Sequence, residues 1–229
     1  MRGDAPFARV FHEERFGVRM TLAHFQTLRS GKWLSDEVIN YYLCMLQEQR
    51  TTEGCRVWFV STHLVTLLRR TGGPEEAVRW PAKANIPYPL ALDLIGIPNH
   101  AVSGVHWPAL LVRPTVRSVT LVDSWIRECL DGQRDTAAGM ADCALVATWL
   151  GCVEKAKGGD PGQRPWKVAG LSKQRGAAPQ QVGTVDCGVF LGMCLDFSSQ
   201  DLPLLYDQTH VEDYRVRMAL SILRGYIVD

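Results

Sequence analysis

The apolar run that follows Cys187 constrains the fold of this chain more than any other feature. After Cys187 and Gly188 comes a set of large apolar residues: Val189, Phe190, Leu191, Met193, Cys194, Leu195 and Phe197. A helix that is apolar on all sides cannot lie on the surface, so the segment predicts a buried helix. We expect Asp186 as its N-cap and Cys187 as its first residue. A thiol there lies at the positive end of the helix dipole, which favours the thiolate.

This cysteine has two interpretations. Free cysteine is among the most buried residue types, so a cysteine on a core helix is most often part of the packing. The alternative is a nucleophile, which needs a base and a group that orients the base. In that case Gly188 would leave room for a substrate backbone to approach the thiol.

A histidine and an aspartate elsewhere in the chain fit these two roles. His106 opens one apolar run and Asp123 closes the next, with a turn expected at Pro114 and Thr115 between them. If the runs form an antiparallel hairpin about that turn, position i faces position 229 − i, and His106 faces Asp123. Directly opposed residues have Cβ atoms about 5 Å apart. The carboxylate could then bind one ring nitrogen and leave the other for the thiol, and a register slip of one residue would break this pairing.

The composition agrees with a compact enzyme. The chain has 229 residues, of which 46% are hydrophobic and 21% charged, as in an ordinary globular domain. A net charge of +1 gives no general attraction for nucleic acid, and we expect no apolar run long enough to span a bilayer. Residues 1–17, without the apolar core of a signal peptide, are expected to be a loose arm, and residues 18–229 the folded domain.

The seven cysteines form an odd set without a Cys-x-x-Cys pair: Cys44, Cys55, Cys129, Cys143, Cys152, Cys187 and Cys194. Without a signal peptide, this pattern indicates free thiols in a reducing compartment, and therefore an intracellular protein, nuclear or cytoplasmic. A zinc site is not expected, because cysteine and histidine lack paired ligand spacing. No metal or other cofactor is predicted.

The rest of the chain predicts an alternation of helices and strands. Helices are expected over 35–49, 62–70, 137–155 and 211–226, with another beginning in 75–80. Strands are expected over 18–22, 56–60, 92–98, 106–112, 116–123 and 167–170, and a loop over 156–165. Strands gathered in the middle of the chain with helices on both sides favour the α+β class.

Several motifs occur in a characteristic order: His106-Trp107, Asp123-Ser124, Gln181 and Asp186-Cys187-Gly188. This order resembles the ubiquitin-like-protein-specific cysteine proteases, the family that includes deSUMOylating and deneddylating enzymes. The upstream block 31–40 is similar to the family's Trp-Leu-Asn-Asp motif, with Ser35 in place of asparagine, and both residues cap helices. The resemblance runs from about Leu28 to the end of the chain. It implies a papain-like fold, with a central mixed sheet flanked by helices and the nucleophile at the N-terminus of a buried helix.

The resemblance also implies a role for each residue of these motifs. Cys187 would be the nucleophile, His106 its base, and Asp123 the group that orients the imidazole. Gln181 would donate from its side chain to the oxyanion, together with the backbone N–H of Cys187. Gln181 could equally be a polar loop residue, and only the family spacing favours it over the adjacent Gln180.

Three further residues would bind the substrate. Trp33 and Trp107 would form the two walls of a slot that admits Gly-Gly and excludes any residue with a Cβ. Asp36 would meet a basic residue of the modifier. Trp107 could instead be a core aromatic, and Asp36 an ordinary acid at a helix start. The remaining histidines, His63, His100 and His210 among them, are expected to lie on the surface or in the core.

The resemblance therefore implies a cysteine isopeptidase or endopeptidase that cleaves after the C-terminal Gly-Gly of a ubiquitin-like modifier. SUMO and its lysine-linked conjugates are the first expectation, NEDD8 the second and ubiquitin the third. The enzyme would be a monomer that binds neither nucleic acid nor membrane. Two other classes stay open: a catalytically silent module that binds the modifier, and an acetyltransferase of the wider clan. The silent module is less expected because all four chemical positions carry the residues that catalysis needs. The acetyltransferase is less expected because a Gly-Gly slot would serve no acetyl donor.

Overall fold

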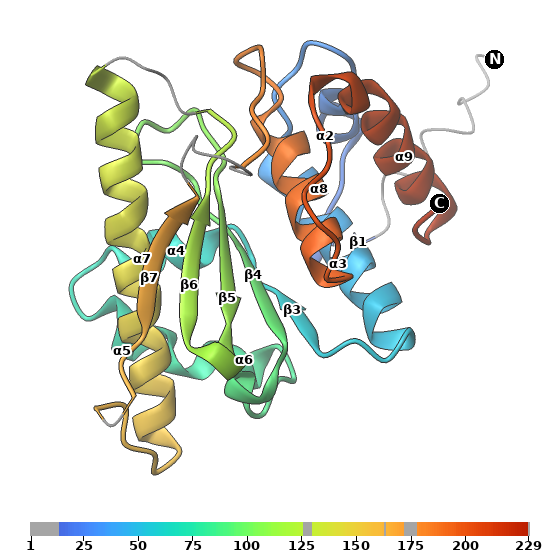
Figure 1. Ribbon diagram of the computed structural model, residues 1–229. Coiled ribbons are helices and arrows are strands. Elements are labelled where there is room, and N and C mark those ends of the chain that lie inside the picture. The colour runs from blue at the N-terminus through green and yellow to red at the C-terminus, as the bar shows by residue number, and fades with distance from the viewer. Residues whose placement is uncertain (1–13, 126–129, 163, 172–177, 229) are drawn as a thin grey trace, which may run out of the picture.

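A five-stranded mixed sheet forms the centre of the computed structural model (Figure 1). The structure describes residues 14–125, 130–162, 164–171 and 178–228. The strands, in spatial order, are β3 (Val57–Phe59), β4 (Leu94–Pro98), β5 (Ala109–Arg113), β6 (Ser118–Val122) and β7 (Lys167–Leu171). The outer pairs β3–β4 and β6–β7 are parallel, and the inner pairs are antiparallel. A small hairpin of β1 (Glu14–Arg15) and β2 (Val18–Arg19) precedes the sheet.

Helices cover both faces of this sheet (Figure 1). They are α2 (Leu22–Phe25), α3 (Asp36–Thr52), α4 (His63–Leu68), α5 (Gly73–Glu76), α6 (Trp80–Lys83), α7 (Leu130–Ala156), α8 (Cys187–Ser199) and α9 (Val211–Arg224). Short 3-10 turns include η2 (Ala77–Arg79), η4 (Pro114–Val116) and η5 (Gln208–His210). On one face α7 packs on β6 and β7 with α4 and α5 beside it, and on the other α8 packs on β4 and β5 with α3 and α9 behind it. The predicted α+β class is confirmed, with a mixed sheet flanked by helices.

Successive side chains of β5 point to opposite faces of the sheet and pack in the two different cores. Its residues Leu110 and Val112 pack with the core on the α7 side, whereas Ala109 and Leu111 pack with the core on the α8 side. All four are buried, because a central strand has no face in contact with water. The hairpin is therefore packed between two cores, and this packing also restricts the movement of the residues at its open end.

Helix α8 begins at Cys187, as predicted, and every one of its residues except Phe197 is buried. Asp186 occupies the N-cap position, but its side chain makes no capping hydrogen bond to the described first turn. Its two carboxylate oxygens bind Arg215 and Gln208 instead. The predicted N-cap position is thus confirmed, although its side chain does not cap the helix, because charge-assisted bonds to a guanidinium are stronger than a bond to a backbone N–H.

The hairpin forms with a different register from the predicted one. Ala109 faces Val122 and Arg113 faces Ser118, so paired positions sum to two more than expected. The turn is longer than a simple reversal, since it contains η4 and then Arg117 in the left-handed region at φ 52°. Side chains alternate with a period of two, so a shift of two residues leaves every side chain on its predicted face.

Other boundaries differ where tight turns interrupt the expected elements. The strand expected over 18–22 ends at Arg19 and gives way to α2. The helix expected from 75–80 is divided into α5, η2 and α6. By contrast, α3 starts where predicted: Ser35 is its N-cap and accepts from Val38 N at 3.3 Å. The six described cysteines are all free, in line with the expected free thiols, and Cys129 lies outside the described residues.

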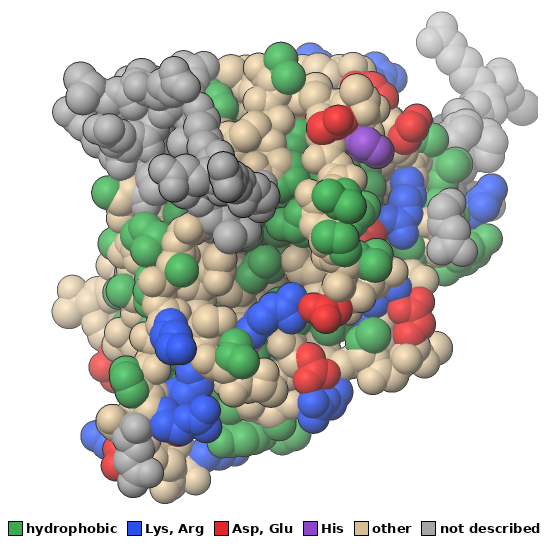
Figure 2. All heavy atoms as spheres, viewed as in Figure 1, with side chains coloured by type: hydrophobic (Ala, Val, Ile, Leu, Met, Phe, Trp, Pro, Cys, Tyr) green, Lys and Arg blue, Asp and Glu red, His purple; other side chains and the backbone are tan. Residues whose placement is uncertain are grey.

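Helix α7 requires one correction. Its segment Ala137–Ala156 is long and apolar enough to cross a membrane by length and composition alone, contrary to expectation. Such a measure is weak evidence, because the core helices of globular proteins pass it too. Here Val146, Trp149 and Leu150 are fully buried against the sheet, so the segment serves as a core helix. Figure 2 shows charged side chains of both signs over one face of the molecule, consistent with the small net charge.

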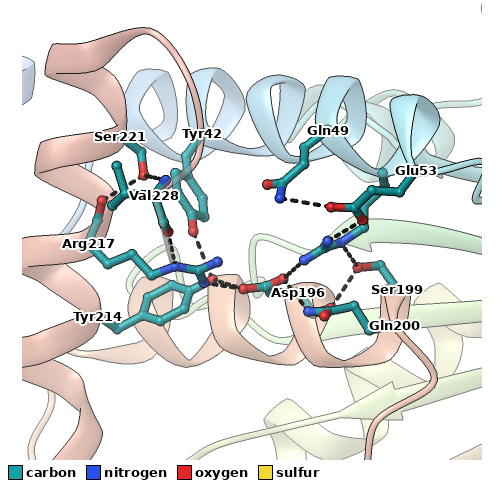
Figure 3. Close-up of polar contacts among 11 residues, drawn as sticks. Tyr42, Gln49, Glu53, Asp196, Ser199, Gln200, Tyr214, Arg217, Ser221 and Val228 are labelled. Atoms are coloured by element: carbon teal, nitrogen blue, oxygen red, sulfur yellow. Dashed lines mark hydrogen bonds and ion pairs between the residues drawn. The ribbon is translucent and has the colours of Figure 1, made fainter.

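A buried carboxylate joins the three helices behind the sheet (Figure 3). Asp196 of α8 is 1% exposed and accepts from Arg50 of α3 at 2.7 Å. It also accepts from Arg217 and, at 3.2 Å, from the hydroxyl of Tyr214, both on α9. The hydroxyl of Tyr42 in turn donates to Tyr214 at 3.2 Å. A buried charge is tolerated only when it is paired and hydrogen-bonded, and this one is satisfied from two sides.

Replacing Asp196 by alanine should therefore destabilise the domain by about 3 to 5 kcal/mol, because two arginines would lose their buried partner. Urea unfolding followed by circular dichroism measures the change. Asp93→Ala is the matched control, since Asp93 pairs with Arg56 on the surface and exposed pairs contribute about 1 kcal/mol or less. Equal losses in the two variants would show that the Asp196 network does not hold the helices together.

Candidate active site

The predicted site residues come from three parts of the fold. His106 lies in the connection between β4 and β5, Asp123 directly follows β6, and Cys187 opens α8. All three are buried, with exposed fractions of 1%, 2% and 1%. The open end of the β5–β6 hairpin therefore meets the N-terminus of the buried helix.

His106 and Asp123 form a close pair. The imidazole Nε2 lies 2.6 Å from Asp123 Oδ1, which also accepts from the backbone N–H of Trp125 at 2.8 Å. The indole of Trp125 lies edge-on to the imidazole, with ring centroids 5.3 Å apart. The other ring nitrogen, Nδ1, is buried without a hydrogen-bond partner of ordinary geometry among the described residues. The predicted His–Asp pairing is thus present, although its derivation from strand register was wrong.

The electrostatics of the pair also involve Cys187. Burial alone would lower the pKa of His106, but hydrogen bonding to Asp123 and to Cys187, together with the charges of these two groups, raises the pKa to about 9. The raised pKa favours the imidazolium form at neutral pH. An imidazolium beside a cysteine at a helix N-terminus is an arrangement that can stabilise a thiolate.

Gln181 lies between β7 and α8 and bonds to Ser124, the second residue after β6. Its backbone N–H donates to Ser124 O at 2.8 Å, and its side-chain oxygen accepts from Ser124 Oγ at 3.2 Å. The amide nitrogen donates to Gly183 O at 2.8 Å, which uses one of its two hydrogens. The neighbouring Gln180 instead donates to Asp123 O. The side chain of Gln181 is thus oriented by Ser124 and keeps a donor available.

Trp33 reaches the segment just before the cysteine. Its indole is 53% exposed, and Nε1 donates to Thr184 O at 2.8 Å. The next residue, Leu34, packs on α8: a Cβ added to Gly188 would lie 3.1 Å from Leu34 Cβ. The space beside Gly188 is therefore filled by the protein's own core, which corrects the expectation that it admits a substrate backbone.

Trp107 is half-buried and packs partly against the α8-side core. Its indole stacks on the ring of His100, with centroids 4.3 Å apart and planes 23° apart. Asp36 is half-buried at the start of α3 and lines a cavity of about 620 Å³ with Glu37 and the neighbouring hairpin. Burial and then the nearby Glu37 raise the pKa of Asp36.

Several neighbours of the site were not found from the sequence. Ser124 and Trp125 follow Asp123 directly, but the sequence motif does not predict which groups these two residues contact. His100 was expected to be an ordinary surface or core histidine. Gln208 and Arg215 lie beyond α8 in the chain, and no local pattern connects them with Asp186. Only the packing of α9 against α8 brings them together.

Comparison with known proteins gives a consistent result. Residues 32–226 match the model of the Ulp1 protease family, C-terminal catalytic domain. Sentrin-specific protease 2 of Homo sapiens is 27% identical over 214 residues, which cover 93% of this chain and 33% of the relative. Ubiquitin-like-specific protease ESD4 of Arabidopsis thaliana is 29% identical over 218 residues, which cover 92% and 41%. The chain spans about a third of the length of the human relative.

Two solved structures share the fold. The SUMO protease Ulp1 with its catalytic cysteine oxidised to a sulfenic acid superposes with a TM-score of 0.77 at 20% identity, covering 96% of this chain and 90% of that one. The C-terminal Ulp1 protease domain in complex with SMT3, the yeast ortholog of SUMO, gives a TM-score of 0.74 at 21% identity, covering 92% and 85%.

The raised pKa of His106 predicts a pH-dependent contribution to stability. The pKa of His106 is about 9 in the folded chain, against 6.5 for a histidine in the unfolded chain, so its contribution to stability is fully present below pH 6.5 and is lost as the pH rises through 9. The free energy of unfolding of the parent should therefore fall relative to that of His106→Asn by up to roughly 3 kcal/mol over this range. Urea titrations at several pH values measure it, with the exposed His63→Asn as control. Parallel curves for parent and His106→Asn would contradict the prediction.

Proposed function

Because the chain belongs to the Ulp1 protease family, we infer that it is a cysteine protease that cleaves after the C-terminal Gly-Gly of a ubiquitin-like modifier. The observation that carries this function is the buried Asp123–His106 pair, which interacts with Cys187 at the start of α8. Acting on a precursor, such an enzyme would release a C-terminal peptide. Acting on a conjugate, it would release the lysine of the modified protein.

The first half of the reaction forms a thioester. The imidazolium of His106 holds the proton of Cys187, and the thiolate attacks the carbonyl carbon of the terminal glycine. The carbonyl π electrons move to oxygen, and the tetrahedral oxyanion accepts from the Gln181 amide and the Cys187 backbone N–H. The C–N bond then breaks as His106 protonates the leaving amine, which leaves the modifier as a thioester of Cys187.

The second half returns the enzyme to its starting state. Neutral His106 removes a proton from water, the resulting hydroxide attacks the thioester, and the C–S bond breaks. The modifier leaves with a carboxylic acid that loses its proton to solvent, and the proton taken from the attacking water stays on the imidazole beside the thiolate. Asp123 holds Nε2 throughout, and its negative charge stabilises the imidazolium in both halves.

The substrate tail is held by the residues around the cysteine. Trp33 and Trp107 form the walls of a narrow slot that accepts two glycines, because indoles are rigid and leave no room for a Cβ. The burial of the reacting groups fits such a slot, since a tail without side chains can reach a thiol that is 1% exposed. Asp36 receives a basic residue of the modifier at the edge of this site.

SUMO is the first choice of modifier. Support comes from the names of the sentrin-specific and ubiquitin-like-specific relatives and from the Ulp1 domain bound to SMT3. NEDD8 and ubiquitin remain the alternatives. A silent binding module is disfavoured because Asp123 and Cys187 both lie close enough to His106 to raise its pKa, as an aligned triad requires. An acetyltransferase is disfavoured because a Gly-Gly slot would serve no acetyl donor.

Probes made of SUMO, NEDD8 or ubiquitin with a C-terminal electrophile test this function. We expect a covalent adduct with SUMO first, seen as a mass shift by intact mass spectrometry. Cys187→Ala should abolish the adduct, because the attacking atom is gone, while the half-buried Cys44→Ala control should retain it. Failure of every probe to label the folded parent would exclude the proposed chemistry, and labelling at another cysteine would exclude Cys187 as the nucleophile.

Replacing Trp107 by alanine tests the slot. In the parent, changing the penultimate glycine of the substrate to alanine should lower kcat/KM about ten- to a hundredfold, since overpacking costs about 1–3 kcal/mol. Trp107→Ala should lower turnover of the Gly-Gly substrate and also narrow the difference between the two substrates. Its control is Trp80→Ala, because Trp80 packs with the core on the α7 side. A folded Trp107→Ala enzyme that discriminates as sharply as the parent would make Trp107 a packing residue.

A further inference from the structure

The short loop between Gln181 and Cys187 connects the two groups that would bind the oxyanion. One donor is the side chain at the start of this loop, and the other is the backbone N–H at its end. The distance between them depends on the conformation of residues 182–186. The contacts that hold this loop therefore help to set the geometry of the proposed oxyanion hole, together with Ser124, which orients the Gln181 side chain.

The side chain of Gln208 bonds to both ends of this loop. The carboxamide oxygen of Gln208 accepts from Val182 N at 2.8 Å, and its nitrogen donates to Asp186 Oδ2 at 2.8 Å. Only this orientation of the amide satisfies both contacts, because one partner is an N–H donor and the other a carboxylate acceptor. Gln208 thus bridges the first and last residues of the loop.

The backbone of Gln208 is itself fixed. It is the first residue of η5, and the preceding Asp207 caps this turn by accepting from Thr209 N at 2.8 Å. His210 completes the capping box by accepting from Asp207 N at 3.2 Å. A carboxamide on a capped turn has little freedom to move, which suits a side chain that has to hold two groups apart at a set distance.

The other carboxylate oxygen of Asp186 is held by α9. Arg215, 2% exposed, donates to Asp186 Oδ1 at 2.7 Å and to Lys32 O at 2.8 Å. It also reaches Thr27 O and Arg29 O at 3.3 and 3.2 Å. Arg215 therefore fixes Asp186 relative to the segment that leads to Trp33. Among the described residues, Gln208 is the side chain that bonds to both Asp186 and Val182.

We propose that Gln208 is a positioning residue of the active site, whose carboxamide sets the distance between the Gln181 side chain and the Cys187 backbone N–H by bridging Val182 and Asp186. This proposal rests on the proposed protease function. Gln208 touches neither the thiol nor the imidazole in any contact described above, so it acts through the loop. Its loss leaves the Val182 N–H without its acceptor and Asp186 Oδ2 without its donor, and the loop widens.

Steady-state kinetics with the C-terminal aminocoumarin derivative of the modifier that labels the parent best test this role. Gln208→Ala should lower kcat about ten- to a hundredfold with little change in KM, because a misplaced donor weakens transition-state binding and not binding of the modifier surface. Alkylation of Cys187 by iodoacetamide, which needs no oxyanion hole, should keep the parent rate. Gln200→Ala is the matched control, since the Gln200 side chain bonds Asp196 at the far end of α8 and should leave kcat unchanged.

Gln208→Glu adds a readout that general destabilisation would not produce. The introduced carboxylate can accept from Val182 but faces the carboxylate of Asp186, so the pair repels when both are ionised. At about pH 8 this variant should be no more active than Gln208→Ala. Towards about pH 6 the introduced carboxylate and the Asp186 carboxylate can share one proton, which restores a hydrogen bond between them. The kcat of Gln208→Glu relative to the parent should then rise severalfold, whereas Gln208→Ala should show no such rise.

The outcomes separate this proposal from the proposed function. A parent that neither labels with any probe nor turns over the substrate overturns the function itself. An active parent with Gln208→Ala at the parent kcat overturns the positioning role. So does a fall in kcat accompanied by an equal fall in the alkylation rate, because the thiol and not the oxyanion hole would then be affected. A folded Gln208→Ala with a raised KM and normal kcat would make Gln208 a substrate-binding residue.

Discussion

The burial of α8 is the constraint on which the rest of the structure depends. A helix that is apolar on every side must be covered on every side, and here the sheet covers one side while α3 and α9 cover the other. Its first residue, Cys187, is therefore enclosed along with the rest. Because α8 packs on β4 and β5, the open end of the β5–β6 hairpin lies beside the N-terminus of α8. His106 and Asp123 therefore lie next to Cys187.

Enclosing this helix also forces polar groups into the interior, where each needs a partner. Asp196 is satisfied by two arginines and a tyrosine, and Asp186 by Arg215 and Gln208. These charges do more than avoid a desolvation penalty, since each carboxylate joins α8 to elements distant in sequence. Buried pairs contribute little net stability but penalise any other arrangement of the same helices. The position of the cysteine is consequently fixed by charge pairs at both ends of its helix.

The parts of this arrangement that the sequence predicted depend on local patterns. The all-apolar run predicted α8 and its first residue, and Ser35 predicted the start of α3. The His106–Asp123 pair was predicted from a register that is wrong by two residues, yet the period of two in a strand preserved which side chains share a face. The failures concern partners remote in sequence. Asp186 is the predicted N-cap residue, but its bond to Arg215 could not be foreseen, and Gly188 was taken for substrate space because its packing against Leu34 could not be foreseen.

These remote contacts imply that the two halves of the site are mechanically linked. Arg215 binds the carbonyl of Lys32, next to Trp33, and the carboxylate of Asp186, next to Cys187. Trp33 itself donates to Thr184 O within the same loop. In the proposed slot, an indole that moves to admit a substrate tail would therefore displace the loop that precedes Cys187. Binding energy at the proposed slot and alignment of the thiol would then be coupled through the Arg215 guanidinium and this loop, which is how contacts remote from the reacting atoms can lower the barrier to reaction.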